Sequence, residues 1–358
     1  MILPKSTHGR GVVKLRHYVL QRPPPPAAGQ RQGIIGPMIL AGIDEAGYGP
    51  ILGPLVVGCC VFEVNDDGDD PPCLWKKLRR VVSKSRSKTG QKIHVNDSKL
   101  VYSPAGGLKG LERSVMALAA AAGVGADDLP GFLQQVGPGT WAQLSEYPWY
   151  AAYEGEKFPI EQDALSIRLL GNSIRAEMER CQTRCAHLAA KVMGERELNR
   201  LLERTRNKSS VLFSMAAGHL DHLLRQFAAR RLVIVCDRQG GREHYGHLLR
   251  LMFEDWALQV TAEGDGHSEY RLSRGGLTVR LMFCEKAETQ CLPVAVASML
   301  SKYLREALMR RFNAYWCKSL PGLEPTAGYY TDGLRFLKDI EAKRREMGVA
   351  DAEMVRAR

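Results

Sequence analysis

Two adjacent carboxylate residues, Asp44 and Glu45, follow the apolar run that begins at Met38. Neighbouring side chains at the end of a strand point in different directions, so both rarely serve packing. Two ionised carboxylates side by side repel each other, and a cation bound between them removes that cost. The pair predicts a site for divalent cations, although a turn that merely uses polar residues explains it equally well.

Two more acids strengthen the cation interpretation. Asp237 ends the apolar run 232–236, and Glu288 lies between a predicted strand and the helix predicted from Leu292. In open α/β sheets, sites form at the carboxyl ends of strands. Four carboxylates there can hold two Mg²⁺ or Mn²⁺ ions for phosphoryl chemistry, and oxygen ligands suit these hard cations better than zinc. Composition alone does not separate Glu288 from its neighbour Glu285.

The charge of the chain suggests a polyanionic partner. Fifty Lys and Arg residues against 39 Asp and Glu residues give a net charge of +11. Residues 76–92 carry eight basic side chains and no acid, and they form either a duplex-binding face or an ordinary solvated one. Gly47 and Gly49 lack a Cβ, so a nucleic-acid backbone can approach them closely.

An α/β domain with a mixed sheet is predicted to position these residues. Apolar β-branched runs predict strands, and periodic runs predict helices. The predicted strands are 38–44, 53–64, 232–236, 258–262, 269–272 and 277–283. The predicted helices are 108–122, 181–204, 209–230, 248–256, 292–312 and 332–345. The looser stretch 123–180 is interpreted as an insertion whose aromatic residues, Trp141 to Tyr153, form its core rather than a base-stacking platform.

The ends of the chain are predicted to lie outside this domain. Residues 1–37 contain six basic residues, no acid and a run of prolines, so we expect a disordered tail, or a translation start at Met38. The domain then covers 38–346, followed by a C-terminal tail over 347–358. No apolar run is long enough to cross a bilayer. Nine scattered cysteines indicate reduced thiols, and we expect a cytoplasmic monomer.

Several motifs resemble one family. The runs 42–57 (GIDEAGYGPILGPLVV) and 96–100 (NDSKL) resemble the first two signatures of the type 2 ribonucleases H, the HII/HIII group. The runs 286–288 (KAE) and 294–303 (VAVASMLSKY) resemble the block with that family's last metal ligand, and 327–331 (AGYYT) resembles a motif of the HII branch. The motifs occur in family order. A Glu in the fourth acidic place is similar to the HIII branch.

This resemblance implies a ribonuclease-H-like fold and an endonuclease that hydrolyses the RNA strand of RNA–DNA hybrids. It assigns two divalent cations, Mg²⁺ or Mn²⁺, to Asp44, Glu45, Asp237 and Glu288. One cation would activate the attacking water, and the other would stabilise the leaving 3′ oxygen. The implied nucleic-acid contacts are Gly47, Tyr48, Gly49, Ser98, Lys99, Ser298, Lys302 and Tyr329.

Three positions depart from the family pattern. Tyr48 stands where the family usually has Arg or Lys, Leu334 where HII has His, and Ala327 where HII has Lys. Tyrosine cannot neutralise a phosphate, so cleavage at single ribonucleotides is in doubt. Two alternatives stay open: a structure-selective DNA nuclease of the wider superfamily, and a nucleic-acid-binding protein without catalysis. The four acids argue against the second, because clustered negative charge does not help a protein that only binds phosphate.

Overall fold

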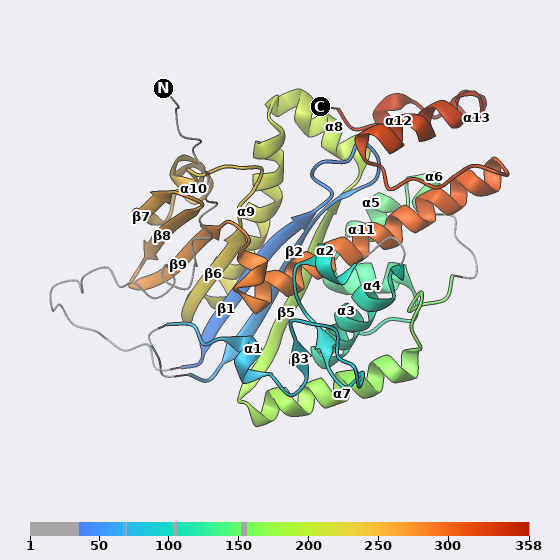
Figure 1. The fold of residues 1–358 in the computed structure, drawn as a ribbon. Helices are drawn as coiled ribbons and strands as arrows, with labels where there is room; N and C mark the ends of the chain where they lie inside the picture. The colour runs from blue at the N-terminus through green and yellow to red at the C-terminus, as the bar shows by residue number, and fades with distance from the viewer. Residues whose placement is uncertain (1–35, 67, 69, 103–105, 152–155, 358) are drawn as a thin grey trace, which may run out of the picture.

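The computed structural model describes residues 36–66, 68, 70–102, 106–151 and 156–357 (Figure 1). The tail predicted over 1–37 therefore lies outside the described residues, apart from its last two. Within the described residues, no helix is both long and apolar enough to cross a membrane.

A seven-stranded mixed sheet forms the centre of the molecule, in the order β5-β2-β1-β6-β9-β8-β7. β1 pairs in parallel with β6, which pairs in parallel with β9, whereas β2 is antiparallel to β1. The predicted class, a mixed sheet flanked by helices, is confirmed. The strands are β1 (Met38–Ala46), β2 (Leu55–Val64), β5 (Thr183–Met193), β6 (Arg231–Asp237), β7 (Ala257–Gly264), β8 (His267–Arg274) and β9 (Leu277–Cys284).

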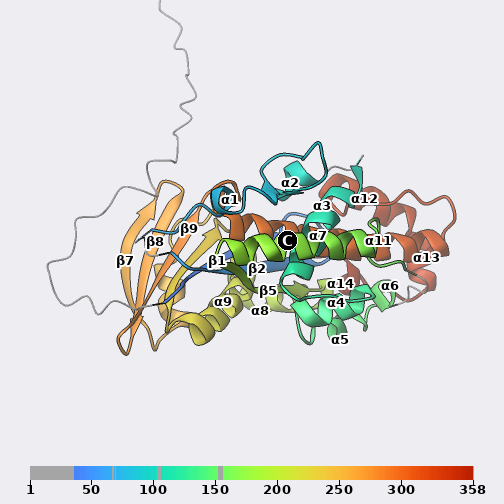
Figure 2. The same cartoon turned by 90° about the horizontal axis from the view of Figure 1, so that it is seen from below.

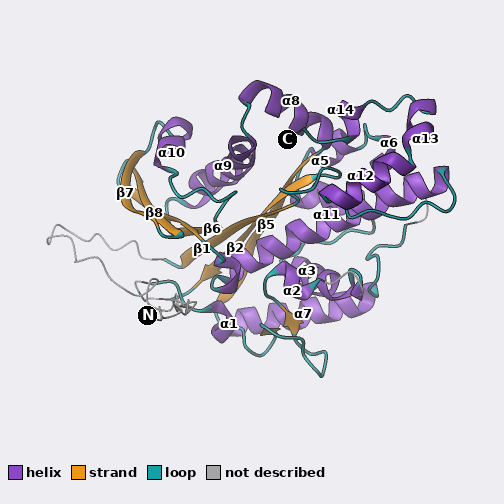
Figure 3. Ribbon diagram, turned by 45° about the horizontal axis from the view of Figure 1, so that its top comes forward, coloured by secondary structure: helices purple, strands orange, loops and turns teal. Residues whose placement is uncertain are grey.

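Helices cover both faces of this sheet (Figure 3). Leu40 of β1 packs in the cluster that contains the long helix α11 (Leu292–Ser319), while Ile39 and Ile43 pack in the cluster that contains α9 (Lys208–Phe227). Because strand side chains alternate between faces, β1 contributes to both cores. The α11 face also carries α3 (Lys109–Ala121) and α7 (Ala164–Arg180), and the α9 face carries α8 (Glu195–Thr205) and α10 (Gly246–Met252).

The shorter elements that complete the fold are α1 (Leu74–Lys77), β3 (Val82–Ser83), β4 (Ile93–His94), α2 (Ser98–Val101), α4 (Leu129–Val136), α5 (Thr140–Leu144), α6 (Pro148–Ala151), the 3₁₀ helix η3 (Ala287–Thr289), α12 (Tyr330–Asp339), α13 (Glu341–Glu346) and α14 (Asp351–Met354). Figure 2 shows the strands β7–β9 at one end of the molecule and α13 at the other.

Two glycines let α11 lie directly on the sheet. A Cβ on Gly42 would overlap the carbonyl carbon of Pro293, and one on Gly58 would come within 2.5 Å of the carbonyl oxygen of Ala297. Such distances are shorter than any side chain tolerates, so only glycine permits this packing. The close approach brings α11 over the end of β1, where Ser301 donates a hydrogen bond to the carbonyl oxygen of Asp44 at 3.1 Å.

The helix predicted over 181–204 is wrong in its first half. Residues 183–193 form β5, and a helix begins only at Glu195. Leu, Ala and Lys are good helix formers, but β5 completes the sheet by pairing with β2 along its length. Tertiary pairing therefore outweighs local propensity here. The single helix predicted over 332–345 is divided into α12 and α13 near Ile340.

The described part of 123–180 packs on α3 and α11. Trp149 is buried and its ring lies 5.8 Å from that of Phe312 on α11. The buried carboxylate of Glu112, on α3, accepts hydrogen bonds from the Ile160, Glu161 and Gln162 amides at 2.7, 2.6 and 2.8 Å. It also accepts one from the Tyr303 hydroxyl at 2.7 Å. The boundaries of the insertion stay a prediction.

Candidate metal centre

Sheet register brings the four predicted carboxylates together. The parallel β1–β6 pairing ends at Ile43 and Cys236, so Asp44 and Asp237 come next at matching positions on the two strands. Asp237 in turn lies beside Cys284, the last residue of β9. The chain then turns into η3, which carries Glu288. Asp44, Glu45, Asp237 and Glu288 therefore occupy one edge of the sheet, as the strand ends predict.

Asp44 is the most enclosed of the four. Its side chain is buried beneath α11. Burial raises the pKa of Asp44 well above its usual range, and the charges of Glu45, Asp237 and Glu288 raise it further. The neighbouring Ser298 hydroxyl on α11 opposes this increase in pKa. A carboxyl group in this position gains from any cation that replaces its lost hydration.

Glu45 and Glu288 each present a buried oxygen with no partner. Oε2 of both side chains is inaccessible to solvent and accepts no hydrogen bond. Burial and the charge of Asp237 raise the pKa of Glu45 to about 8 and that of Glu288 to about 7. Unsatisfied buried acceptors are rare because they lose their hydration without compensation. A cation is one ligand that would satisfy them.

Asp237 connects the strand to η3. Its Oδ1 accepts a hydrogen bond from the Ala287 amide at 2.9 Å. The interaction between the Asp237 and Glu288 carboxyl groups raises the pKa of Glu288 and opposes the increase that burial causes in the pKa of Asp237. Glu285, the competing candidate, is instead half-exposed and lies 3.1 Å from Arg238 in an ion pair.

The four carboxyl groups are suitable ligands for divalent cations, but their oxygens do not converge on one point in this structure. In the part of the chain that the structure describes, no three His, Cys, Asp or Glu side chains are placed as a ready ligand set. Four neighbouring carboxylates repel each other, and bound cations would offset that repulsion. The fit therefore rests on the unpartnered oxygens of Glu45 and Glu288 and on the all-oxygen donor set.

Two predicted phosphate contacts lie beside the carboxyl groups. Ser298 donates a hydrogen bond to Ser98 at 3.1 Å, joining α11 to α2. Lys99 is exposed, and its charge lowers the pKa of both Glu45 and Asp237. Asp97 caps the start of α2 by accepting a hydrogen bond from the Lys99 amide at 2.9 Å. Lys99 is thus held at the rim of the carboxyl cluster.

The loop 47–54 between β1 and β2, called the glycine loop below, places Tyr48 against the core cluster that contains α9. Gly47 has φ +88°, a conformation that other residues rarely adopt, while a Cβ on the exposed Gly49 would meet only open space. Tyr48 is partly buried. Burial raises the pKa of Tyr48, and the charge of Glu45, three residues earlier in the chain, raises it further.

Lys302 and Tyr329 have different surroundings. Lys302 is mostly buried, with Nζ 2.8 Å from Glu306 Oε1 and 4.6 Å from the centre of the Tyr102 ring. Tyr329 is 51% exposed at the start of α12, and its ring lies 5.7 Å from the guanidinium of Arg305. These contacts join neither residue to the carboxyl cluster.

The side chains that support the glycine loop were not predicted from the sequence. Buried Arg356 donates hydrogen bonds to the carbonyl oxygens of Gly47 and, at 3.3 Å, Pro50. Buried Glu195 accepts one from the Gly53 amide at 3.0 Å. Burial lowers the pKa of Arg356 to about 10, and the charge of Glu195 opposes that decrease. Residues near 356, expected to form a tail, therefore contact the site, and no local pattern links positions so distant in sequence.

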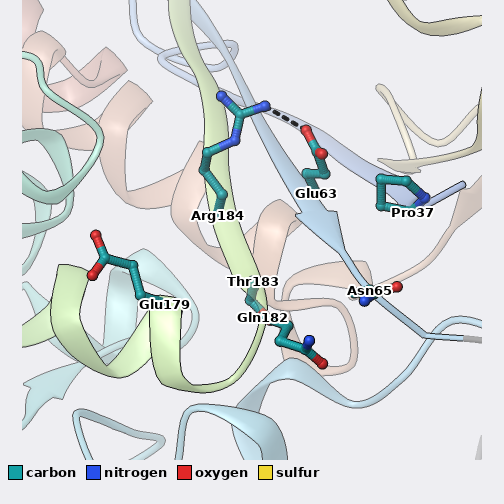
Figure 4. Close-up of a pocket in the computed structure, with 7 residues that line it drawn as sticks. All are labelled: Pro37, Glu63, Asn65, Glu179, Gln182, Thr183 and Arg184. Carbon is teal, nitrogen blue, oxygen red and sulfur yellow. Dashed lines mark hydrogen bonds and ion pairs between the residues drawn. The ribbon is translucent and has the colours of Figure 1, made fainter.

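A surface hollow of about 360 Å³ lies at the other end of β1 (Figure 4). Pro37, Glu63 and Arg184 contribute to its lining, and the Glu63–Arg184 ion pair crosses one side of it. Glu63 pairs with Ile39 in the β1–β2 register, far along the strand from Asp44. This hollow is therefore separate from the carboxyl cluster.

No family model and no curated protein matches the chain. Its fold is similar to solved structures of ribonuclease HII, H2 and HIII chains at low identity. Ribonuclease HII of Archaeoglobus fulgidus, solved in a complex with PCNA, is 14% identical with a TM-score of 0.40, covering 89% of this chain and 94% of that one. Ribonuclease H2 of Pyrococcus horikoshii is 14% identical with a TM-score of 0.39, covering 88% and 92%. Bst-RNase HIII, solved with Mn²⁺, is 14% identical with a TM-score of 0.41, covering 90% and 67%.

Proposed function

We propose that this protein is a metal-dependent endoribonuclease that hydrolyses the RNA strand of RNA–DNA hybrids. The observation that carries the proposal is the meeting of Asp44, Glu45, Asp237 and Glu288 at the carboxyl ends of β1, β6 and β9. Two of these side chains hold buried oxygens without hydrogen-bond partners. The four residues are also those that the resemblance to type 2 ribonucleases H assigns to cation binding.

In this proposal the four carboxylates hold two Mg²⁺ or Mn²⁺ ions. When bound, the ions would supply an activated water and stabilise charge on the leaving oxygen. The side chains and backbone of the protein would position the substrate. Ser98 and Ser298 lie between α2 and α11 beside Asp44, and Lys99 offers a positive charge to an incoming phosphate. Gly49 leaves open space in which the substrate backbone can approach.

The basic segment 76–92 supports a duplex as the substrate. Lys84 donates a hydrogen bond to the carbonyl oxygen of Thr289 at 2.5 Å, which attaches this segment to the helix that carries Glu288. Lys76, Arg79, Arg80, Arg86 and Lys88 are exposed along it. Positive charge attached next to the carboxyl cluster would hold a duplex across the site through its phosphates.

Cleavage of three labelled duplexes tests the proposal. The purified protein is incubated with Mg²⁺ or Mn²⁺ and an RNA–DNA hybrid, a DNA duplex with one embedded ribonucleotide, or a branched DNA. We expect the hybrid to be cut, and Asp44→Asn or Glu288→Gln to reduce the rate about a hundredfold or more. Cutting of branched DNA alone would instead identify a structure-selective DNA nuclease, and binding without any cutting would identify a non-catalytic protein.

Glu285→Gln is the matched control for Glu288→Gln. Both substitutions remove one carboxylate from the same turn, but Glu285 is half-exposed and paired with Arg238. We expect Glu285→Gln to retain cleavage. Equal loss of cleavage in both variants would contradict the assignment of Glu288 as the cation ligand.

A further inference from the structure

Two cationic side chains accompany Tyr48 at the edge of the carboxyl cluster. Nζ of Lys208, the first residue of α9, lies 5.2 Å from the centre of the Tyr48 ring. Arg242, in the loop between β6 and α10, is close enough for its charge to lower the pKa of Tyr48, which burial and Glu45 raise. Tyr48 cannot neutralise a phosphate, but these two neighbours can.

Several contacts hold the three side chains in one wall. Arg242 donates a hydrogen bond through Nη2 to Ser209 Oγ at 2.6 Å, which fixes the loop to the start of α9. Its guanidinium carbon also lies 5.9 Å from the centre of the Tyr245 ring. A Cβ on Gly240 would lie 3.1 Å from the Tyr48 hydroxyl oxygen, so this loop packs against the tyrosine.

Arg242 has donor capacity that its surroundings do not use. Its Nε is buried and has no hydrogen-bond partner. Within the described residues, the guanidinium of Arg242 contacts Ser209 and the Tyr245 ring but forms no ion pair. A guanidinium without an ion-pair partner suits a phosphate, because its planar fork can donate to two oxygens of the phosphate group. Arg204 and Arg206, both exposed just before α9, extend the positive charge along the surface.

We propose that Tyr48, Lys208 and Arg242 form a subsite for a phosphodiester of the substrate strand, next to the phosphate that is cut. This inference rests on the proposed function for the identity of the strand. Clustered carboxylates repel a nucleic acid. The positive charges of Lys208 and Arg242 offset that repulsion beside Glu45. The Tyr48 hydroxyl adds a hydrogen-bond donor, and its ring supports the Lys208 ammonium.

Salt-dependent binding tests the subsite. Affinity for a labelled RNA–DNA hybrid is measured by fluorescence anisotropy between 50 and 200 mM salt, with Ca²⁺ under conditions in which electrophoresis detects no cutting. Removing one side chain that neutralises a phosphate reduces the slope of log affinity against log salt by about 1. We expect that reduction for Arg242→Gln and for Lys208→Gln, about twice as much for the double variant, and weaker binding with an unchanged slope for Tyr48→Phe.

Arg225→Gln is the matched control, because it removes the same charge from the far end of α9. Arg225 is exposed and pairs with Asp221 at 2.9 Å, so we expect its slope to equal that of the unsubstituted protein. Slopes for Arg242→Gln and Lys208→Gln that equal the control slope overturn the subsite. If Arg242→Gln does not fold, Arg242→Lys replaces it, and it should keep the slope while weakening binding because the planar fork is lost.

The subsite and the proposed function fail in different ways. A hybrid that is cut while the slopes stay unchanged overturns only the subsite. Reduced slopes with no hybrid cleavage support a phosphate subsite and overturn the proposed reaction.

Discussion

Gly47 and Gly49 flank the same tyrosine but are glycines for different reasons. Gly47 has a positive φ, and a Cβ there would lie 2.6 Å from the Pro54 carbonyl oxygen and 2.8 Å from the Arg305 side chain. Gly49 has neither constraint in the free protein. Its lack of a side chain therefore matters only for a ligand that approaches the loop.

Alanine substitutions should therefore separate folding from binding. We expect Gly47→Ala to lower the free energy of unfolding by about 1–3 kcal/mol, because the backbone conformation is unfavourable for alanine. Gly49→Ala should change it by less than about 0.5 kcal/mol, yet weaken hybrid binding. Urea unfolding and anisotropy measure the two effects. Normal binding by Gly49→Ala would show that the substrate does not approach this loop.

At the residue scale, the places of the acids along their strands could be predicted from the sequence, and the side chains that support the loop could not. Asp44, Glu45 and Asp237 end apolar strands, a position visible in the sequence. Glu288 and Glu285 differ only in what surrounds them, since one is buried beside Asp237 and the other pairs with Arg238. Lys302 follows Ser298 by one helical turn, but Glu306 one turn further along binds its ammonium group. Such competition between partners is decided by tertiary structure.

Among the elements, α3 depends on one buried acid. Glu112 receives four hydrogen bonds that connect α3 to residues 160–162 and to α11. We expect Glu112→Ala to lower the free energy of unfolding by about 3 kcal/mol or more, because it leaves buried donors without partners. The exposed Glu179, on α7, provides the control Glu179→Ala, which should cost less than about 0.5 kcal/mol. Equal effects in denaturant unfolding would contradict this role.

Elements with clear periodicity were predictable from the sequence, and β5 was not. The strands that carry the acids are short apolar runs, which are typical of buried sheet. β5 lies at the edge of the sheet and contains Leu, Ala and Lys, residues that favour helices. Its conformation follows from pairing with β2, a contact between segments more than a hundred residues apart that local patterns do not encode.

For the whole molecule, buried His219 should make stability depend on pH. It is a residue of α9, and its Nε2 lies 3.0 Å from the carbonyl oxygen of Val57 on β2. Burial lowers the pKa of His219 to about 3. Above pH 6.5 the imidazole is neutral in both states. As pH falls below 6.5 the unfolded chain gains a proton that the folded protein excludes, so stability is lost by about 1.4 kcal/mol per pH unit.

His219→Gln keeps a hydrogen-bond donor and removes the titration. Between pH 7 and pH 5, its free energy of unfolding should fall by about 2 kcal/mol less than that of the unsubstituted protein. His247→Gln, at an exposed position on α10, should show no such difference. The free energies of unfolding of the three proteins are measured with denaturant at several pH values. The carboxyl groups are the same in all three proteins, so their contributions cancel in the differences. Parallel curves for all three proteins would exclude His219 as the cause.

The support of the glycine loop by Arg356 has a consequence for synthesis. Arg356 follows Gly47 by 309 positions, so the ribosome makes the loop long before it makes the residue that holds it. Domains begin to fold from the N-terminal side while the chain is still growing. β1 and β2 can pair early, but the loop beside Asp44 and Glu45 stays unsupported until residue 356 emerges. The loop beside the carboxyl cluster would therefore take up its supported geometry only after residue 356 has left the ribosome.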